Sequence, residues 1–168
     1  RVDCMSISSA FALGGFDNHD GLLGDSPTTG PHGSNLKTLN DALMYFWEAM
    51  GDIGMRDSVT TFTASDFGRT YRSNGNGSAH GGAGPHPVMG GNQVNGNKIY
   101  GNYGSIVTGG SQDTWEQGQF IPTTSVDAYG FELARWMGVP ASSMDTVFPH
   151  IGRFLDVYNP ATHLGMLS

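Results

Sequence analysis

The feature that most constrains this fold is the concentration of glycine in the middle of the chain. Of the 168 residues, 26 are Gly and 8 are Pro, and more than half of the glycines lie between Gly68 and Gly118. A glycine inside a helix costs about 1 kcal/mol relative to alanine. The sequence therefore excludes a compact helical bundle, and loops with short extended elements are expected in this region.

Charge and hydropathy exclude two kinds of partner. Eight basic residues stand against fifteen acidic ones, for a formal net charge of -7, and no run of Lys or Arg is present to neutralise phosphates, so nucleic acid is not an expected partner. No stretch approaches the roughly 20 apolar residues that cross a bilayer, so we expect a chain that does not span a membrane. The single Cys4 cannot form an internal disulfide, and we expect it to be a buried small hydrophobe.

Hydrophobic periodicity predicts two helices. The first begins after Ser34 and stops at Gly51 or Gly54, because apolar residues recur there at spacings of three, four and seven. Its expected stripe is Leu36, Leu39, Leu43, Phe46, Trp47 and Met50. The second opens at Thr124 and ends at Gly138. Its expected buried stripe is Val126, Tyr129, Leu133, Trp136 and Met137.

Short extended segments surround the first helix. Val2–Phe11 and the β-branched Val59–Ala64 both read as strands, and a brief strand is expected at Pro87–Met89. Ser73–Gly84 is too rich in Gly and Asn to be regular, and a short hairpin is expected around Lys98–Tyr103. Strand, helix, strand in this order predicts a parallel crossover, hence an α/β fold with a partly parallel sheet flanked by helices.

Polar residues follow three of the expected strand ends. They are Asp17 with His19, Asp66 with Arg69, and His80 with His86 nearby. Ligands of open α/β sheets bind outside the carboxyl ends of the strands. Mixed carboxylates and imidazoles suit divalent cations such as zinc, manganese or iron, while an arginine suits an oxyanion such as phosphate or sulfate. This constellation predicts a metal site with an anionic ligand.

Each of these residues also has a structural interpretation, and both stay open at this stage. Asp17, beside two glycines, fits an Asx-turn, and Asp66 can cap the turn that follows it. His80 and His86 lie in a segment of small residues, where histidines are more often exposed loop residues than ligands. Arg69 can hold loops together through backbone carbonyls.

Several short motifs follow one another in a fixed order. They are Gly14-Gly15-Phe16-Asp17-x-His19, Gly30-Pro31-His32, Ser65-Asp66-Phe67-Gly68-Arg69-Thr70, Asn74-Gly75-x-Gly77-Ser78-x-His80-Gly81, and Gly90-Gly91 with Ile99-Tyr100-Gly101. Thr123–Asp127 and Val147–Phe154 extend the pattern towards the end of the chain. In this combination the sequence resembles the DUF1501 family of bacterial proteins, which is grouped with the alkaline phosphatase and sulfatase superfamily.

The resemblance implies an architecture, a location and a ligand set. Residues 1–168 would be a single domain or the carboxy-terminal part of a larger α/β sandwich, whose amino-terminal half, or a partner chain, supplies the nucleophilic Ser or Thr. Members usually begin with a twin-arginine type export signal, so a periplasmic or secreted location is expected. Asp17, His19, Asp66 and His80 occupy positions comparable to the superfamily's metal ligands, which implies a divalent metal, with Zn, Mn or Ca as candidates.

The sequence departs from the family pattern next to the last of these ligands. The family usually has Asp before the histidine where this chain has Ala79, and an aromatic residue commonly stands where it reads Gly81–Gly84. Such a carboxylate is either a ligand or the group that orients the imidazole. Removing an orienting group typically costs 10–100-fold in metal affinity.

Two functions are expected from different classes. The first is an exported protein of metal-dependent phosphoester or sulfoester hydrolase ancestry, acting on a small anionic ester, with Arg69 or His86 offsetting oxyanion charge. The second is a non-catalytic structural or binding component of an extracellular or envelope assembly. Ala79 and the long Gly/Asn loops favour the second, because such loops pack against neighbours without precise side-chain geometry.

Overall fold

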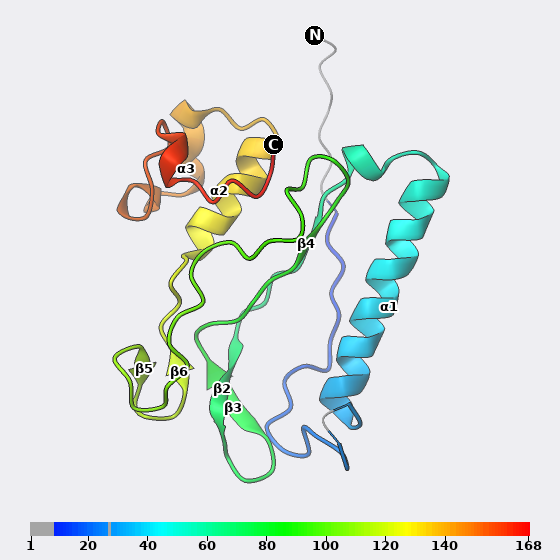
Figure 1. The fold of residues 1–168 in the computed structure, drawn as a ribbon, viewed down its shortest axis with the longest axis vertical. Coiled ribbons are helices and arrows are strands. Elements are labelled where there is room, and N and C mark those ends of the chain that lie inside the picture. Colours follow the sequence, from blue (N-terminus) through cyan, green and yellow to red (C-terminus); the bar gives the residue numbers. More distant parts are fainter. Residues whose placement is uncertain (1–8, 27) are drawn as a thin grey trace.

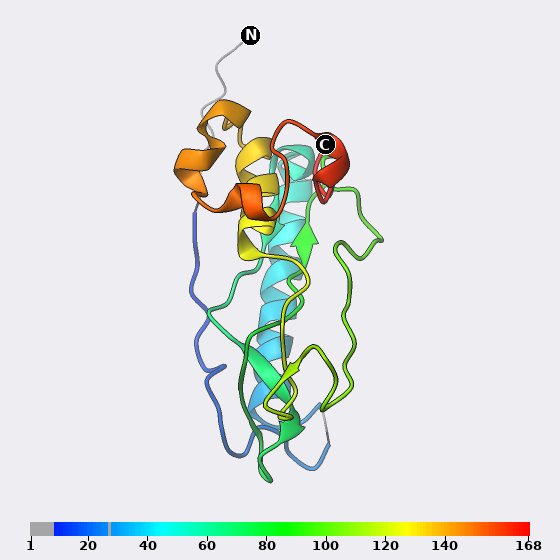
Figure 2. The same cartoon turned by 90° about the vertical axis from the view of Figure 1, so that its left-hand side faces the viewer.

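The computed structural model describes residues 9–26 and 28–168. One long helix, α1 (Pro31–Asp52), lies along one side of the molecule. The carboxy-terminal helices gather at one end and a β-hairpin extends towards the other (Figures 1 and 2). No described helix combines the length and the apolar character that a membrane crossing requires.

Helix α1 starts earlier than the sequence pattern indicates. Pro31 occupies its first turn and Gly30, with a φ of 101°, precedes it, whereas the expected start was Ser34. Proline suits a first helical turn because its missing N–H would be unpaired there anyway. The helix runs through the expected apolar stripe, yet none of its residues is buried. Of its apolar stripe, Leu36 and Phe46 are exposed and the other four residues are half-buried.

All the strand pairs in the described residues are antiparallel. They are β1 (Thr61–Phe62) with β4 (Val88–Met89), β2 (Gly68–Ser73) with β3 (Ser78–Gly81), and β5 (Asp113–Thr114) with β6 (Gln119–Phe120). The strand expected at Pro87–Met89 is confirmed as β4. The expected partly parallel sheet, and with it the alkaline phosphatase-like sandwich, is wrong for the described residues, which form a mixed fold of helices and small antiparallel sheets.

No parallel crossover is found among the described residues, where β1 pairs with β4. The Val59–Ala64 segment contributes β1, which pairs with β4 through Thr61 with Met89 and Phe62 with Val88. Of the strand expected at Val2–Phe11, residues 2–8, including Cys4, lie outside the described residues, and 9–11 form no strand. The described chain thus offers β1 no parallel neighbour.

Two regions rich in glycine and asparagine differ from the expectation in opposite directions: Ser73–Gly84 is more regular than expected, and Lys98–Tyr103 is less regular. Ser73–Gly84 contains β3 and the turn that joins it to β2, because Gly75 adopts a φ of 106° and so lets the chain reverse tightly. Lys98–Tyr103 forms no hairpin. A hairpin forms instead at β5–β6, where the side chain of Asp113 accepts hydrogen bonds from the backbone N–H groups of Gly118 and Gln119 at the start of β6.

A small hydrophobic core lies at the carboxy-terminal end. Helix α2 (Val126–Trp136) packs against α3 (Met144–Val147) and the turn at Ile151–Arg153. The buried cluster is Ala128, Phe131, Met144, Ile151 and Leu155. Ser125 caps α2 by accepting a hydrogen bond from the Ala128 N–H at 3.0 Å.

The buried face of α2 differs from the predicted stripe. Val126 is 79% exposed, while Phe131 and Glu132 are the side chains fully enclosed. Glu132 turns inwards because its carboxylate accepts a hydrogen bond from the Gly165 N–H and lies 3.4 Å from the Arg135 guanidinium. Because the buried face of α2 includes the charged Glu132, the periodicity of apolar residues does not predict that face.

Candidate metal centre

Three side chains from two distant segments converge at the β2–β3 hairpin. Asp17 and His19 lie in a stretch without regular secondary structure, and His80 lies in β3. Asp17 Oδ1 is 2.7 Å from His80 Nε2 and 3.3 Å from His19 Nε2, and the two imidazole nitrogens are 3.1 Å apart. Among the described residues, these form the one group of three or more acidic, histidine or cysteine side chains whose ligand atoms come together.

The spacing of these three atoms suits a small tetrahedral cation. A zinc ion with ligand bonds of about 2.0–2.1 Å and tetrahedral angles separates neighbouring ligand atoms by about 3.3–3.4 Å. The observed separations of 2.7, 3.1 and 3.3 Å are close to that triangle. The side chains of Asp17, His19 and His80 are 68%, 53% and 42% exposed, so a metal ion has direct access.

The electrostatics of the group favour an ionised carboxylate. The hydrogen bond from His80 lowers the pKa of Asp17 below its ordinary value of 3.8. Desolvation acts in the opposite direction, and smaller contributions from the charge of His80 and from the charge and hydrogen bond of His19 lower the pKa further. A carboxylate that stays deprotonated is ready to bind a cation, because metal ligands must lose their protons.

Aromatic stacking orients the His80 imidazole. The Phe67 ring lies parallel to it, with centroids 3.9 Å apart and an interplanar angle of 6°. The His19 ring lies on a tilted plane, with its centroid 4.7 Å from that of His80. Phe67 therefore restricts the rotation of the imidazole that the hairpin contributes.

The loop that carries Asp17 and His19 is held by side chains. Residues 9–21 make no backbone-to-backbone hydrogen bond with other described residues. Instead, Asn74 Nδ2 donates to the His19 carbonyl at 2.9 Å, and Arg69 donates to the Phe16 carbonyl. Gly77 packs so close to the His19 carbonyl that a Cβ there would overlap it. The turn of the β2–β3 hairpin thus binds this loop through Asn74 and Gly77.

The other predicted site residues, Asp66, His86 and Arg69, are not among the three converging side chains. Asp66 is exposed in the turn before β2 and is outside the group formed by Asp17, His19 and His80. His86 Nδ1 lies 3.3 Å from the Thr63 hydroxyl, and its ring stacks on Tyr129 at 6.1 Å. Arg69 binds backbone carbonyls, which is the structural interpretation of that residue.

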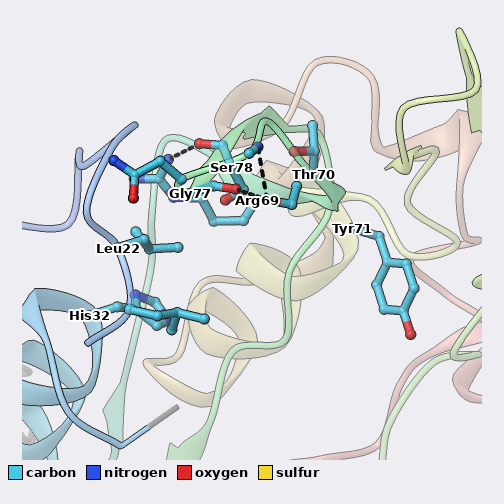
Figure 3. A pocket seen from close by; sticks show the side chains of 11 residues that line it. Leu22, His32, Arg69, Thr70, Tyr71, Gly77 and Ser78 are labelled. Atoms are coloured by element: carbon cyan, nitrogen blue, oxygen red, sulfur yellow. Dashed lines mark hydrogen bonds between the residues drawn. The ribbon is translucent and has the colours of Figure 1, made fainter. Parts of the chain in front are cut away.

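A cavity of about 450 Å³ adjoins the β2–β3 hairpin (Figure 3). Leu22, His32 and Arg69 line it together with the hairpin turn. Two of its lining residues, His32 and Ser78, each carry a buried polar atom without a hydrogen-bond partner, Nδ1 and Oγ respectively. Arg69 lines the cavity and also donates to the Phe16 carbonyl in the loop that carries Asp17 and His19, whereas none of the three candidate ligands lines the cavity.

Sequence reasoning missed the supporting residues of this centre. Phe67, Asn74 and Gly77 all lie inside the short motifs that the sequence displays, but no spacing assigns a role to any of them. Their roles depend on contacts across 13 residues for Phe67 with His80 and 55 for Asn74 with His19. The Asn-Gly turn was the available signal, and it indicated only a loop.

A comparison with protein-family models identifies a family for this chain. A family model described as "Protein of unknown function (DUF1501)" matches residues 8–126, which include Asp17, His19 and His80. Searches of the curated proteins and of the solved structures find no match to the chain.

Proposed function

The chain belongs to the DUF1501 family, and we propose that it binds one divalent metal ion through Asp17, His19 and His80 for the hydrolysis of a small anionic ester. The observation that carries the proposal is the triangle of ligand atoms with sides of 2.7, 3.1 and 3.3 Å. One carboxylate and two imidazoles suit zinc or manganese better than calcium, which takes six to eight oxygen ligands.

The reaction class follows from three protein ligands on an open surface. Catalytic zinc sites commonly have three protein ligands and leave a position free for water or substrate. A metal ion held here would polarise an ester oxygen or activate a water. Asp17, His19 and His80 would hold the ion, and Phe67 would keep the His80 ring in place. We place the substrate among phosphoesters and sulfoesters, on the resemblance to the phosphatase and sulfatase superfamily.

The same resemblance supports an exported protein that works in the periplasm or outside the cell. It also supports a partner segment that supplies the nucleophile, either an amino-terminal half or another chain. The exposed surface favours such a partner independently. The chain exposes 11446 Å², whereas a folded monomer of 17.8 kDa exposes about 8,000 Å². Large apolar side chains of α1, such as Leu36 and Tyr45, contribute to the excess.

A metal titration tests the proposal. The wild-type chain should bind close to one equivalent of Zn²⁺ or Co²⁺, with the Co²⁺ absorption of a site that contains nitrogen ligands. His80→Ala and Asp17→Ala should each weaken binding by more than about 100-fold, since losing an orienting group alone costs 10–100-fold. His150→Ala is the matched control, because His150 is exposed and lies outside the group. Less than a tenth of an equivalent of metal after exhaustive dialysis would contradict the proposal.

The same surface supports a second candidate function, a structural component of an extracellular or envelope assembly. The exposed apolar side chains on α1, among them Leu36 and Tyr45, and a surface excess of this size fit a chain that packs against another polypeptide. The variants Asp17→Ala and His80→Ala separate the two candidates. The assay uses the protein together with the amino-terminal half or partner chain that supplies the nucleophile. Loss of aryl phosphate or aryl sulfate hydrolysis in the variants then supports the enzyme, whereas assembly that persists without any hydrolysis in the wild type supports the structural component.

A further inference from the structure

Arg69 is the one described side chain that bonds to both segments carrying the candidate ligands. Its Nη2 donates to the Phe16 carbonyl, one residue before Asp17. Its Nη1 donates to the Ser78 carbonyl at 2.8 Å, two residues before His80. In the hairpin register, Arg69 is also directly opposite His80. Figure 3 shows the guanidinium beside Ser78 and Gly77 at the hairpin.

The guanidinium also forms one layer of a stack that ends on a ligand. Its central carbon lies 5.2 Å from the centroid of the Phe67 ring, and the other contact of that ring is the parallel stack with His80 at 3.9 Å. Arg69 thus acts on the imidazole in two ways, through the backbone of β3 and through Phe67.

The backbone hydrogen bond that ties the end of the loop carrying Asp17 and His19 to the hairpin, from the Leu22 N–H to the Asn76 carbonyl, lies on the His19 side of the loop and leaves the Asp17 side to Arg69. The loop residues 9–21 have no backbone hydrogen bonds of their own to the hairpin, and Asn74 reaches only the His19 side of the loop. A guanidinium is suited to the task, because it presents several N–H donors in a rigid planar fork and keeps its charge at all relevant pH values. Lysine presents one compact ammonium group and cannot span two carbonyls with the same geometry.

From these contacts we infer that Arg69 is a positioning residue of the metal centre, which joins the Asp17–His19 loop to β3 and so sets the separation of the three ligands. This inference rests on the proposed metal site and assigns Arg69 a different role from that of an oxyanion-binding group. The guanidinium contributes through the ligands it aligns, and its removal should change metal affinity and coordination geometry together.

The experiment compares Arg69→Ala and Arg69→Lys with Arg72→Ala in the full chain. Arg72 is the matched control, because it is an exposed arginine of the same strand whose Nη1 reaches only the Glu116 carbonyl at 3.5 Å. Arg69→Ala should weaken Co²⁺ binding about 10–100-fold and alter the visible absorption bands. Arg72→Ala should bind within about twofold of wild type, and millimolar guanidinium should partly restore binding to Arg69→Ala. If Arg69→Ala does not fold, Arg69→Lys carries the test and should show a smaller loss with the same change of spectrum.

A measurement without metal separates this inference from the proposed function. The His19 and His80 rings, 4.7 Å apart, should give a nuclear Overhauser contact in the wild type and in Arg72→Ala, and lose it in the Arg69 variants. Wild-type affinity and an unchanged spectrum in both Arg69 variants would overturn the inference while the metal site stands. A wild type that binds no metal would refute the proposed function, and the ring contact would then decide whether Arg69 positions the two segments.

Discussion

Replacement of Glu132 tests how the carboxy-terminal core is held together. Its carboxylate is completely buried, with one oxygen 3.2 Å from the Gly165 N–H and the other 3.4 Å from Arg135 Nη2. Hydrogen bonds to a charged group contribute about 1.5–3 kcal/mol. The ion pair adds only about 0–1 kcal/mol, because the Arg135 side chain is 40% exposed. Glu132→Ala should therefore lower the free energy of unfolding by about 2–4 kcal/mol.

Glu132→Gln separates the hydrogen bond from the charge. Glutamine keeps the volume and one acceptor for the Gly165 N–H, so we expect a loss of roughly 1 kcal/mol. Urea unfolding followed by tryptophan fluorescence measures both variants, since Trp136 lies in the same helix. Glu48→Ala, at an exposed carboxylate paired with Arg56, is the control and should change little. Equal losses for Gln and Ala, or losses below about 0.5 kcal/mol for both, would refute the assignment of Glu132 as the link between α2 and the end of the chain.

Four further predictions concern single positions. Burial raises the pKa of Tyr129 from 10.0 to about 12. Between these two pH values the folded state keeps the phenolic proton that the unfolded chain loses, so the free energy of unfolding should fall as pH rises from 10 to 12. Tyr129→Phe should abolish that fall in pH-dependent urea titrations, and should cost about 1 kcal/mol below pH 10 through the lost bond to the Thr63 carbonyl; an unchanged slope would contradict the burial. Ser125→Ala removes the α2 cap and should cost about 1 kcal/mol in thermal unfolding, whereas no loss would mean that the cap does not form in solution. Ala79→Asp restores the family's carboxylate, but side chains alternate across a strand, which puts position 79 on the face opposite His80. Metal affinity should therefore change less than about threefold in a Co²⁺ titration, and a larger gain would place the carboxylate in the site. Tyr45→Lys changes a residue of α1 that is 78% exposed and should alter the free energy of unfolding by less than about 0.5 kcal/mol; a loss of several kcal/mol would show that this face of the helix is covered.

Local sequence patterns predicted the elements whose causes are local. The two main helices lie near their expected places, because an apolar stripe with proline, serine and glycine at the ends defines a helix within a few residues. The candidate pair Asp17 and His19 was also visible, since both follow a glycine turn that brings them near each other in the chain. The buried face of α2 was not predictable in this way, because it depends on Glu132 finding the Gly165 N–H 33 residues away.

The amino-acid sequence by itself determined the types of side chain available, the glycine-rich loops and the position of α1. Only the tertiary structure decided that strands pair antiparallel, that His80 meets Asp17 across 63 residues while Asp66 stays outside, and that Arg69 bonds to Phe16 and Ser78. The physical reason is that each of these contacts depends on where two separate segments dock. Docking is set by hydrogen bonds and close backbone approaches, such as Gly77 against His19, which have no periodic signature in the sequence.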